Sequence, residues 1–297
     1  MIKHLEELLD LSRGKGKRLA VAVAQDEVVL KAVDAAFKED IIKPILVGDE
    51  KKIKEEAEKA GVDLKGYEVV HAEGIEEAAA KAVELAAKGE ADLLMKGKLQ
   101  TAQIMRTVLK EEYGLRTGMT MGMVSVFEIP NFPRLLILTD AGMTIAPDLN
   151  QKIHLIQHAI RVAKVLGIET PKVALVSAVE TVNPKIPATV DAAIIAKMAD
   201  RGQIKGAVID GPFALDNVVS KEAAEHKGIK SPVAGEADII VTPDIDAGNI
   251  LYKALIFLAG AKSASTILGA KVPVVLTSRA DSDETKLYSI ALTAALS

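Results

Sequence analysis

The segment VVLTSRADSDETK, residues 274–286, passes from an apolar run into a cluster of polar and charged groups. Its opening residues are aliphatic or β-branched, which is typical of a strand buried on both faces. Ser278 and Arg279 follow at the end of that strand, and Asp283 and Glu284 stand where a helix should begin. A guanidinium forms a planar fork that matches phosphate oxygens, and a serine hydroxyl can donate to an oxygen that becomes negative. This strand end therefore predicts a site for an anion.

A second apolar run leads into KGKLQTAQIMR, residues 96–106. Lys96, together with exposed amides at the start of the next helix near Thr101, would favour an anion. Gly97 lets the backbone approach a ligand closely because it has no side chain. Arg106 falls about a turn and a half further on, on an adjoining helix face. We expect these four residues to bind substrate.

Acidic and amide groups mark further element ends in the second half of the chain. Asp140 lies in LTDAG, after an apolar run, and Asp210 is expected at the tip of a strand in IDGPFALD. Capping of the next helix is an equally good interpretation of Asp210. Gly248 and Asn249 are unusual in the first turns of a helix because both have poor helix propensity. Either a close packing contact or a ligand would explain them.

Strand-like and helix-like segments alternate along the whole chain, which predicts the α/β class with mainly parallel, doubly wound sheets. Ligands of such sheets bind beyond the carboxyl ends of the strands, where the candidate residues fall. The expected strands are 18–24, 43–48, 67–72, 91–97, 122–128, 134–142, 172–178, 206–212, 237–243 and one from 273; the expected helices include 26–39, 49–61, 74–90, 148–167 and 187–202.

The turn-rich stretch IPNFPR, with two prolines, suggests a domain boundary near residue 130. The last strand and helix are the natural final elements of the sheet that contains the N-terminal segment. We therefore expect a first α/β domain of residues 1–130 plus about 265–297, and a second α/β domain of residues 131–264.

Composition and charge exclude several classes of protein. The 297 residues are 49% hydrophobic and 26% charged, which describes a well-cored globular protein of one or two domains. Aromatic residues make up only 3% and the net charge is −4, so nucleic acid and anionic membranes are not expected partners. The absence of cysteine excludes disulfides, thiolate catalysis and cysteine metal ligands. His154 and His158 share a helix face, but without a third ligand in suitable spacing we expect no metal site.

The sequence also indicates where the protein works. The opening residues MIKHLEELLDLSR form an amphipathic helical pattern without the apolar core of a signal peptide. No apolar run approaches the roughly 20 residues that a membrane helix needs. We expect a cytoplasmic protein.

Several segments occur together, in order, along nearly the whole chain: VAVAQDEVVLKAV, MKGKLQTAQIMR, EYGLRTG, RLLILTDAG, DRGQIKGAVIDGPFALD, SPVAGEADII, AGNILYK and VPVVLTSRADSDETK. In this combination the chain resembles the phosphate acetyl/butyryltransferase family. The resemblance implies two α/β domains of the isocitrate/isopropylmalate dehydrogenase type, an active site in the interdomain cleft, and a homodimer or larger homo-oligomer. It also implies acyl-CoA and phosphate as substrates, converted reversibly to acyl phosphate and CoA without a metal, a cofactor or a covalent intermediate.

The resemblance also implies roles for single residues. Ser278, Arg279 and Arg106 match active-site residues of the acetyl-transferring members, and AGNILYK adds Lys253 to the substrate-binding candidates. Two positions depart from those members. They have an aspartate where this chain has Thr285, and an arginine where it has Phe257. These departures favour the butyryl branch of the family.

A general base helps this reaction because the thiol of CoA is largely protonated at neutral pH. Asp283 and Glu284 adjoin the position of the missing aspartate, so either is a candidate for that base. The alternative is that both only complement the dipole at the start of the last helix.

Three other functions remain open from the sequence. The first is transfer of acetyl in place of butyryl. The second is a metal-dependent dehydrogenase of the same fold, for which Asp210, Asp244 and Asp246 are available but form no convincing cluster. The third is a non-catalytic module that binds CoA or phosphate.

Overall fold

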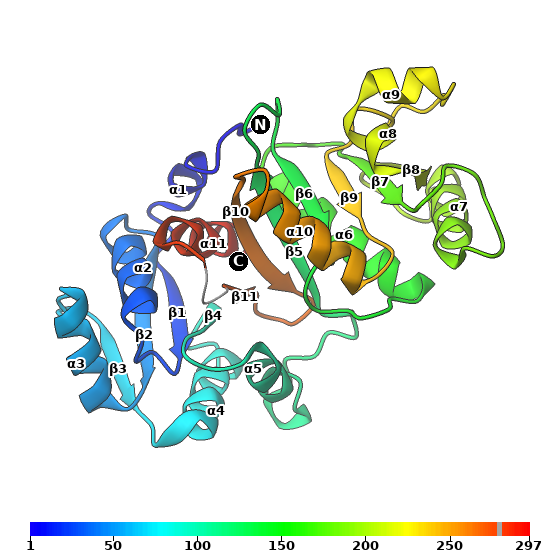
Figure 1. The fold of residues 1–297 in the computed structure, drawn as a ribbon. Coiled ribbons are helices and arrows are strands. Elements are labelled where there is room, and N and C mark those ends of the chain that lie inside the picture. The colour runs from blue at the N-terminus through cyan, green and yellow to red at the C-terminus, as the bar shows by residue number, and fades with distance from the viewer. Residues whose placement is uncertain (278–280) are drawn as a thin grey trace. The chain divides into compact units, whose positions relative to one another are not determined.

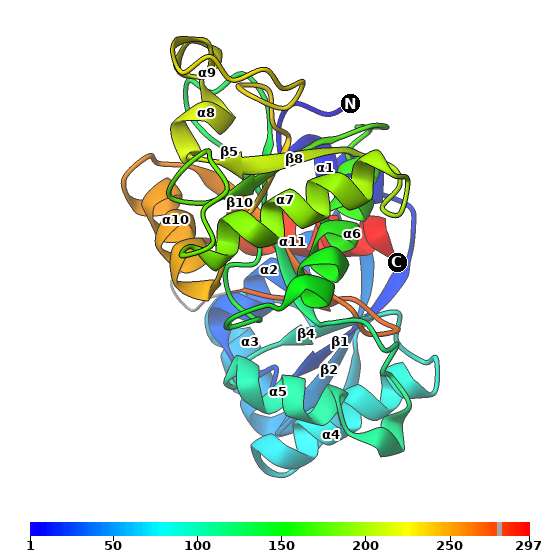
Figure 2. The same ribbon diagram turned by 90° about the vertical axis from the view of Figure 1, so that its right-hand side faces the viewer.

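A computed structural model describes residues 1–277 and 281–297 of the chain. The chain folds into two compact units, which we call unit 1 (Met1–His4 and Thr120–Lys262) and unit 2 (Leu5–Met119 and Ser263–Ser297). Each has mainly parallel strands with helices packed on both faces (Figures 1 and 2), so the predicted α/β class is confirmed. Among the described residues, no helix is both long enough and apolar enough to cross a bilayer.

The chain passes from unit 2 to unit 1 at Thr120, ahead of the proline-containing turn at which the sequence suggests a boundary. The reason is that strand β5 (Gly122–Glu128) pairs antiparallel with β6 (Leu136–Thr139). The turn IPNFPR therefore joins two neighbouring strands of one unit and does not separate two units.

Unit 2 has the strand order β3-β2-β1-β4-β11-β10, parallel except for the antiparallel pair β10–β11. Helices α1, α2, α3 and α11 pack together on one face of this sheet, and α4 and α5 lie on the other (Figure 2). The strands are β1 (Lys17–Ala22), β2 (Ile42–Gly48), β3 (Glu68–His71), β4 (Leu93–Lys96), β10 (Lys262–Leu268) and β11 (Val274–Val275). The helices are α1 (Glu7–Ser12), α2 (Glu27–Lys38), α3 (Glu50–Ala60), α4 (Gly74–Ala87), α5 (Thr101–Val108), the 3-10 helix η1 (Glu111–Tyr113) and α11 (Asp283–Leu296).

Unit 1 has the strand order β5-β6-β9-β7-β8, in which only β5 runs antiparallel to its neighbour. Helices α6 and α7 cover one face and α10 covers the other (Figures 1 and 2). Besides β5 and β6, the strands are β7 (Lys172–Val176), β8 (Val208–Phe213) and β9 (Ile239–Val241). The helices are α6 (Leu149–Val165), α7 (Pro187–Asp200), α8 (Leu215–Val219), α9 (Lys221–His226) and α10 (Ile245–Phe257).

The central strands of both units are buried, as their near-continuous aliphatic runs predict. In β1, Leu19 to Ala22 are fully inaccessible to solvent, and β6 and β9 are buried along their whole length. Strands buried on both faces can expose polar side chains to solvent or a ligand only at their ends. The ends are therefore where the functional site must be sought.

Candidate functional site

A small polar cavity lies in unit 2 beyond the carboxyl ends of β1 and β4. These two strands are neighbours, yet the chain leaves them in opposite directions, since β1 connects through α2 to β2 and β4 leads into α5 on the other face. Doubly wound sheets bind ligands in the crevice at such a switch point. The cavity measures about 110 Å³, several times the roughly 30 Å³ that one water molecule occupies. It is lined by Asp26, Val28, Val29, Lys96, Gly97, Lys98, Thr277 and Lys286.

Lysines dominate the charge of this cavity, which we call the lysine cavity. Its lining holds three lysines against one aspartate, Asp26, whose carboxylate already accepts the Val29 N–H. Lys96 is only 8% exposed and Lys286 only 2%. Burying an ammonium group is costly unless an opposite charge accompanies it. An anion of phosphate size bound in this cavity would offset that cost for Lys286.

Lys286 occupies a position that is unfavourable for a cation. It lies in the first turn of α11, where the helix dipole is positive, and its ammonium donates to the Asp281 carbonyl. In the part of the chain that the structure describes, its ammonium has no carboxylate partner. Capping does not require it, because the Ser282 hydroxyl accepts the Thr285 N–H at 3.1 Å. A buried, dipole-opposed lysine at a cavity therefore indicates a binding role.

Gly97 is needed for a packing contact with the neighbouring strand. A Cβ at this position would stand 2.2 Å from the Val23 carbonyl oxygen and 2.8 Å from that of Ala22. The Gly97 N–H donates to the Ala22 carbonyl at 2.8 Å, which fixes this approach. The close contact expected from the sequence is thus made with the chain itself, and it shapes one wall of the lysine cavity.

Ser278 and Arg279 lie outside the described residues. The nearest described residues in sequence are Thr277, which is buried and lines the lysine cavity, and Asp281, whose carbonyl accepts from the Lys286 ammonium.

The other unit 2 candidates lie outside the cavity lining. Thr101 is the first residue of α5 and Arg106 lies exposed in its last turn. Asp283 and Glu284 begin α11 and are exposed, and the Tyr288 hydroxyl donates to the Glu284 carboxylate at 2.9 Å. These four residues remain sequence-based candidates.

Asp140 has a structural use for both of its carboxylate oxygens. The side chain is 2% exposed, and its oxygens accept the N–H groups of Gly142, Met143 and Thr144 at 2.8, 3.0 and 3.0 Å. Burial raises the pKa of Asp140, and these backbone hydrogen bonds oppose that shift. This arrangement favours a role in holding the loop after β6 over direct contact with substrate.

The unusual Gly248–Asn249 pair in α10 packs against this same loop. A Cβ on Gly248 would stand 2.1 Å from the Asp140 carbonyl oxygen, so only glycine fits there. The Asn249 amide donates to the Ala141 carbonyl at 3.1 Å. Of the two explanations that the sequence leaves open, the close packing contact is present.

Asp210 and Lys253 are the remaining unit 1 candidates, and they lie in β8 and α10. Asp210 lies inside β8, paired with Ala174, and its carboxylate accepts the Gly211 N–H, so its predicted place at the strand tip is wrong. The helix-capping alternative is also wrong, because α8 begins only after Ala214. Lys253 is exposed on α10, with its ammonium 6.0 Å from the centre of the Phe257 ring.

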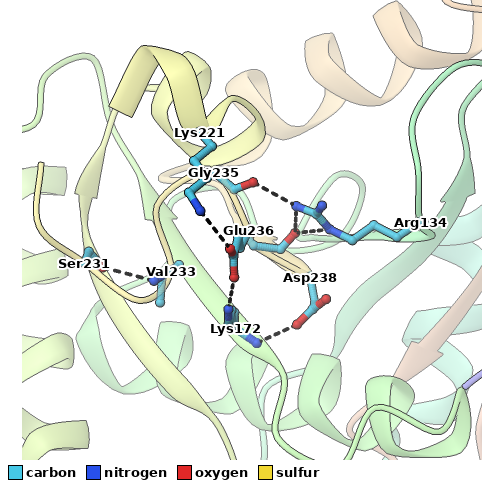
Figure 3. A network of polar contacts seen from close by, with 9 residues as sticks. Arg134, Lys172, Lys221, Ser231, Val233, Gly235, Glu236 and Asp238 are labelled. Carbon is cyan, nitrogen blue, oxygen red and sulfur yellow. Dashed lines mark hydrogen bonds and ion pairs between the residues drawn. The ribbon is translucent and has the colours of Figure 1, made fainter. Parts of the chain in front are cut away.

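A conspicuous polar network of unit 1 lies at the opposite, amino end of its strands (Figure 3). Arg134 donates to the Gly235 and Ala237 carbonyls, and Asp238 accepts the Lys172 N–H at 2.8 Å. Burial raises the pKa of Asp238. Because ligands of parallel sheets bind at the carboxyl ends, we assign this network to fixing the loop before β9.

His154 and His158 both contact Thr120. The His154 Nδ1 lies 3.2 Å from the Thr120 nitrogen, and the His158 Nε2 lies 2.9 Å from its carbonyl oxygen. Burial lowers the pKa of His158. Residues 1–277 and 281–297 contain no group of three or more metal-ligating side chains.

Comparison with known proteins places the chain in a family. Residues 3–81 and 71–294 match the family described as phosphate acetyl/butaryl transferase. A phosphate acetyltransferase of Thermotoga maritima is 60% identical over 290 residues, which are 98% of each chain, and a phosphate butyryltransferase of Clostridium acetobutylicum is 50% identical over 99% and 98% of the two chains. A branched-chain phosphotransacylase from Enterococcus faecalis shares the fold with a TM-score of 0.81 and 36% identity, covering 94% of this chain and 99% of its own. The chain belongs to the phosphate acetyl/butyryltransferase family.

Proposed function

We propose that this protein transfers a short acyl group, butyryl in the first instance, reversibly between CoA and inorganic phosphate. The observation that carries the proposal is the lysine cavity, where Lys96 and Lys286 are buried beside the strand end that leads to Ser278 and Arg279. The full-length relatives named for this chemistry support it independently.

We assign a separate role in the reaction to each group of site residues. Lys96, Lys286 and Arg279 compensate the charge of phosphate or acyl phosphate. Ser278 donates to the thioester carbonyl oxygen as it gains negative charge. Phosphate oxygen attacks that carbonyl carbon, the carbon–sulfur bond breaks, and CoA leaves as thiolate and takes up a proton. Holding both substrates together supplies much of the rate enhancement.

The proposal uses CoA and phosphate as substrates and assigns no cofactor. It also takes the protein to act in the cytoplasm, as the sequence pattern suggests, and as a homodimer or larger homo-oligomer, as the family resemblance implies. Transfer of acetyl is the second candidate, and the name of the Thermotoga relative favours it.

Butyryl-CoA and phosphate are expected to release CoA thiol only when both are present. We expect kcat/KM for butyryl-CoA to exceed that for acetyl-CoA, because two lost methylenes in an apolar pocket weaken transition-state binding by about 1–3 kcal/mol. A thiol-detection assay over a series of acyl chain lengths measures this. A higher value for acetyl-CoA would assign the protein to acetyl transfer, and reduction of a nicotinamide with hydroxy acids, without thiol release, would refute acyl transfer altogether.

We further propose that Asp283 or Glu284 takes the proton of the CoA thiol. Asp283→Asn or Glu284→Gln should then slow attack of CoA on butyryl phosphate about tenfold or more near neutral pH. Alkaline pH should partly restore the rate, because free thiolate accumulates. Rate–pH profiles of both variants test this. If both profiles match the parent protein, the two carboxylates serve only the dipole of α11.

A further inference from the structure

A second cavity lies at the switch point of unit 1. Strands β9 and β7 are neighbours, yet the chain leaves β7 through α7 on one face and β9 through α10 on the other. The cavity opens beyond the carboxyl ends of these two strands, where Val176 ends β7, Ser177 follows it, and Thr242 follows β9. Its volume is about 830 Å³, within the roughly 300–1,000 Å³ typical of sites for small organic ligands. We call it the apolar cavity.

The walls of this cavity are mostly aliphatic. Ile186, which immediately precedes α7, lines the cavity together with Val176 of β7 and with Ile250, Leu251 and Ala254 of α10. Ile250 is 70% exposed, which is a large solvated apolar surface for a single side chain. Covering such surface with an apolar ligand is favourable because it removes apolar area from water.

Charge in the apolar cavity does not favour an anion. Lys152 is buried and forms an ion pair with Asp191 at 2.7 Å, so its charge is already neutralised. Asp244 caps α10 by accepting the Ala247 N–H at 2.9 Å and adds a further negative group. In the lysine cavity of unit 2, cations outnumber anions. The apolar cavity therefore fits an uncharged ligand.

One polar group in the wall is unsatisfied. The Ser177 Oγ is buried and has no hydrogen-bond partner among the described residues. A buried hydroxyl without a partner costs free energy, and such groups in native structures often await a ligand or a water. A ligand that carries amide or carbonyl groups among apolar groups would satisfy it.

The wall beside Ser177 is held in place by other contacts. The Thr242 hydroxyl donates to the Asp140 carbonyl at 3.0 Å, and Gly248 lets α10 pack directly on that carbonyl. The N–H groups after Asp140 are in turn held by its carboxylate. The cavity is thus supported by the same loop that the sequence marks at Asp140.

We propose that the apolar cavity binds the uncharged end of acyl-CoA, namely the acyl chain and the amide-bearing pantetheine arm. This inference rests on the proposed acyl transfer, and it adds which unit selects the acyl chain and with which residues. Ile250, Leu251 and Ala254 contact the apolar groups, and the Ser177 hydroxyl pairs with an amide or carbonyl of the arm. Phosphate recognition stays with unit 2.

Two variants test the proposal against a matched control. Ala254→Leu fills the cavity from α10 with a residue of good helix propensity. Ala193→Leu makes the same change at a half-buried position of α7 that does not line the cavity. Ser177→Ala removes only the unsatisfied hydroxyl, so folding does not suffer from it.

We expect Ala254→Leu to raise the KM for butyryl-CoA about tenfold or more and to weaken binding of S-butyryl pantetheine similarly, with the KM for phosphate unchanged. Ser177→Ala should raise the KM for butyryl-CoA about fivefold while Tm is unchanged or higher. Ala193→Leu should match the parent protein in all three measurements.

Different results overturn different statements. Parental KM values for butyryl-CoA in both Ala254→Leu and Ser177→Ala would refute the inference while leaving acyl transfer intact. A raised KM for Ala254→Leu accompanied by a lower native mass would also refute it, because the groove would then be a contact between copies. If the parent protein releases no thiol from any acyl-CoA, the proposed function fails, whereas equilibrium binding of S-butyryl pantetheine still tests the cavity.

Discussion

Replacing Lys286 with methionine is expected to raise the KM for phosphate roughly a hundredfold, because a charge-assisted hydrogen bond contributes about 1.5–3 kcal/mol. Methionine keeps the unbranched apolar stem that fills the space beneath the lysine cavity, so the change removes the ammonium and little else. The KM for butyryl-CoA should change far less, since the charge of Lys286 faces the small cavity of unit 2. Steady-state kinetics with each substrate varied in turn measures both values.

The same variant should be more stable than the parent protein in the absence of phosphate. Lys286 is 2% exposed and opposes the dipole of α11, so removing its charge relieves a desolvation cost. We expect a gain of about 1 kcal/mol in the free energy of unfolding. Added phosphate should raise the Tm of the parent protein more than that of the variant.

A matched control is Lys271→Met, because Lys271 is exposed in the same unit and lies outside the lysine cavity. It should leave both KM values and the phosphate-induced rise in Tm unchanged. Parental phosphate kinetics in Lys286→Met would contradict the anion-binding role of Lys286. In a double-mutant cycle with Lys96→Met, the two lysines should prove non-additive, because they share one ligand.

Much of the site was predictable because strand ends can be read from hydrophobic periodicity. The runs before Lys96 and Asp140 predict β4 and β6, and both residues do lie at the carboxyl ends of those strands. The sequence also indicates the packing contact of Gly248 in α10, because a glycine has poor helix propensity and is unusual in the first turns of a helix.

The sequence does not identify Lys286 as a candidate site residue, and the reason is physical. In sequence it follows Asp283 and Glu284 in a polar helix start, where a lysine ordinarily faces solvent. The packing of α11 against α1, α2 and the sheet buries this helix, and no local sequence pattern encodes those contacts. The available signal was a cation in a first helical turn, which the helix dipole disfavours.

The sequence does not predict strand β10, because its composition is not the aliphatic one that is typical of a buried strand. The segment KSASTIL is rich in small hydroxyl-bearing residues, yet all but its first residue are buried. Ser265 donates its N–H to the Ser289 hydroxyl of α11, a partner far away in the sequence. Asp210 was misplaced for a related reason, since glycine and proline in IDGPFALD suggested a turn, whereas β8 continues through both to Phe213.

Replacing Asp140 with alanine is expected to destabilise the protein by about 3 kcal/mol, since at least the backbone N–H groups of Gly142, Met143 and Thr144 lose their acceptor at once. Part of that loss is recovered, because water can reach the exposed Gly142 and because burial of a carboxyl group is relieved. Asp210→Ala is the matched control in the same unit, since the Asp210 carboxylate accepts one N–H and is only half-buried. This control should lower the free energy of unfolding by about 1 kcal/mol or less. Urea unfolding of the three proteins measures the differences.

The pH dependence of Asp140→Asn tests whether burial governs this carboxyl. Burial raises its pKa above the ordinary value of 3.8, so its contribution to stability is full below that value and declines as pH rises through the folded-state pKa. Asparagine cannot ionise, so the destabilisation caused by Asp140→Asn should be larger in mildly acidic buffer than at neutral pH. A destabilisation that grows with pH would mean that the three N–H groups hold the carboxylate ionised more strongly than burial opposes it. The loop after β6 would then be an anion-stabilising turn in its own right.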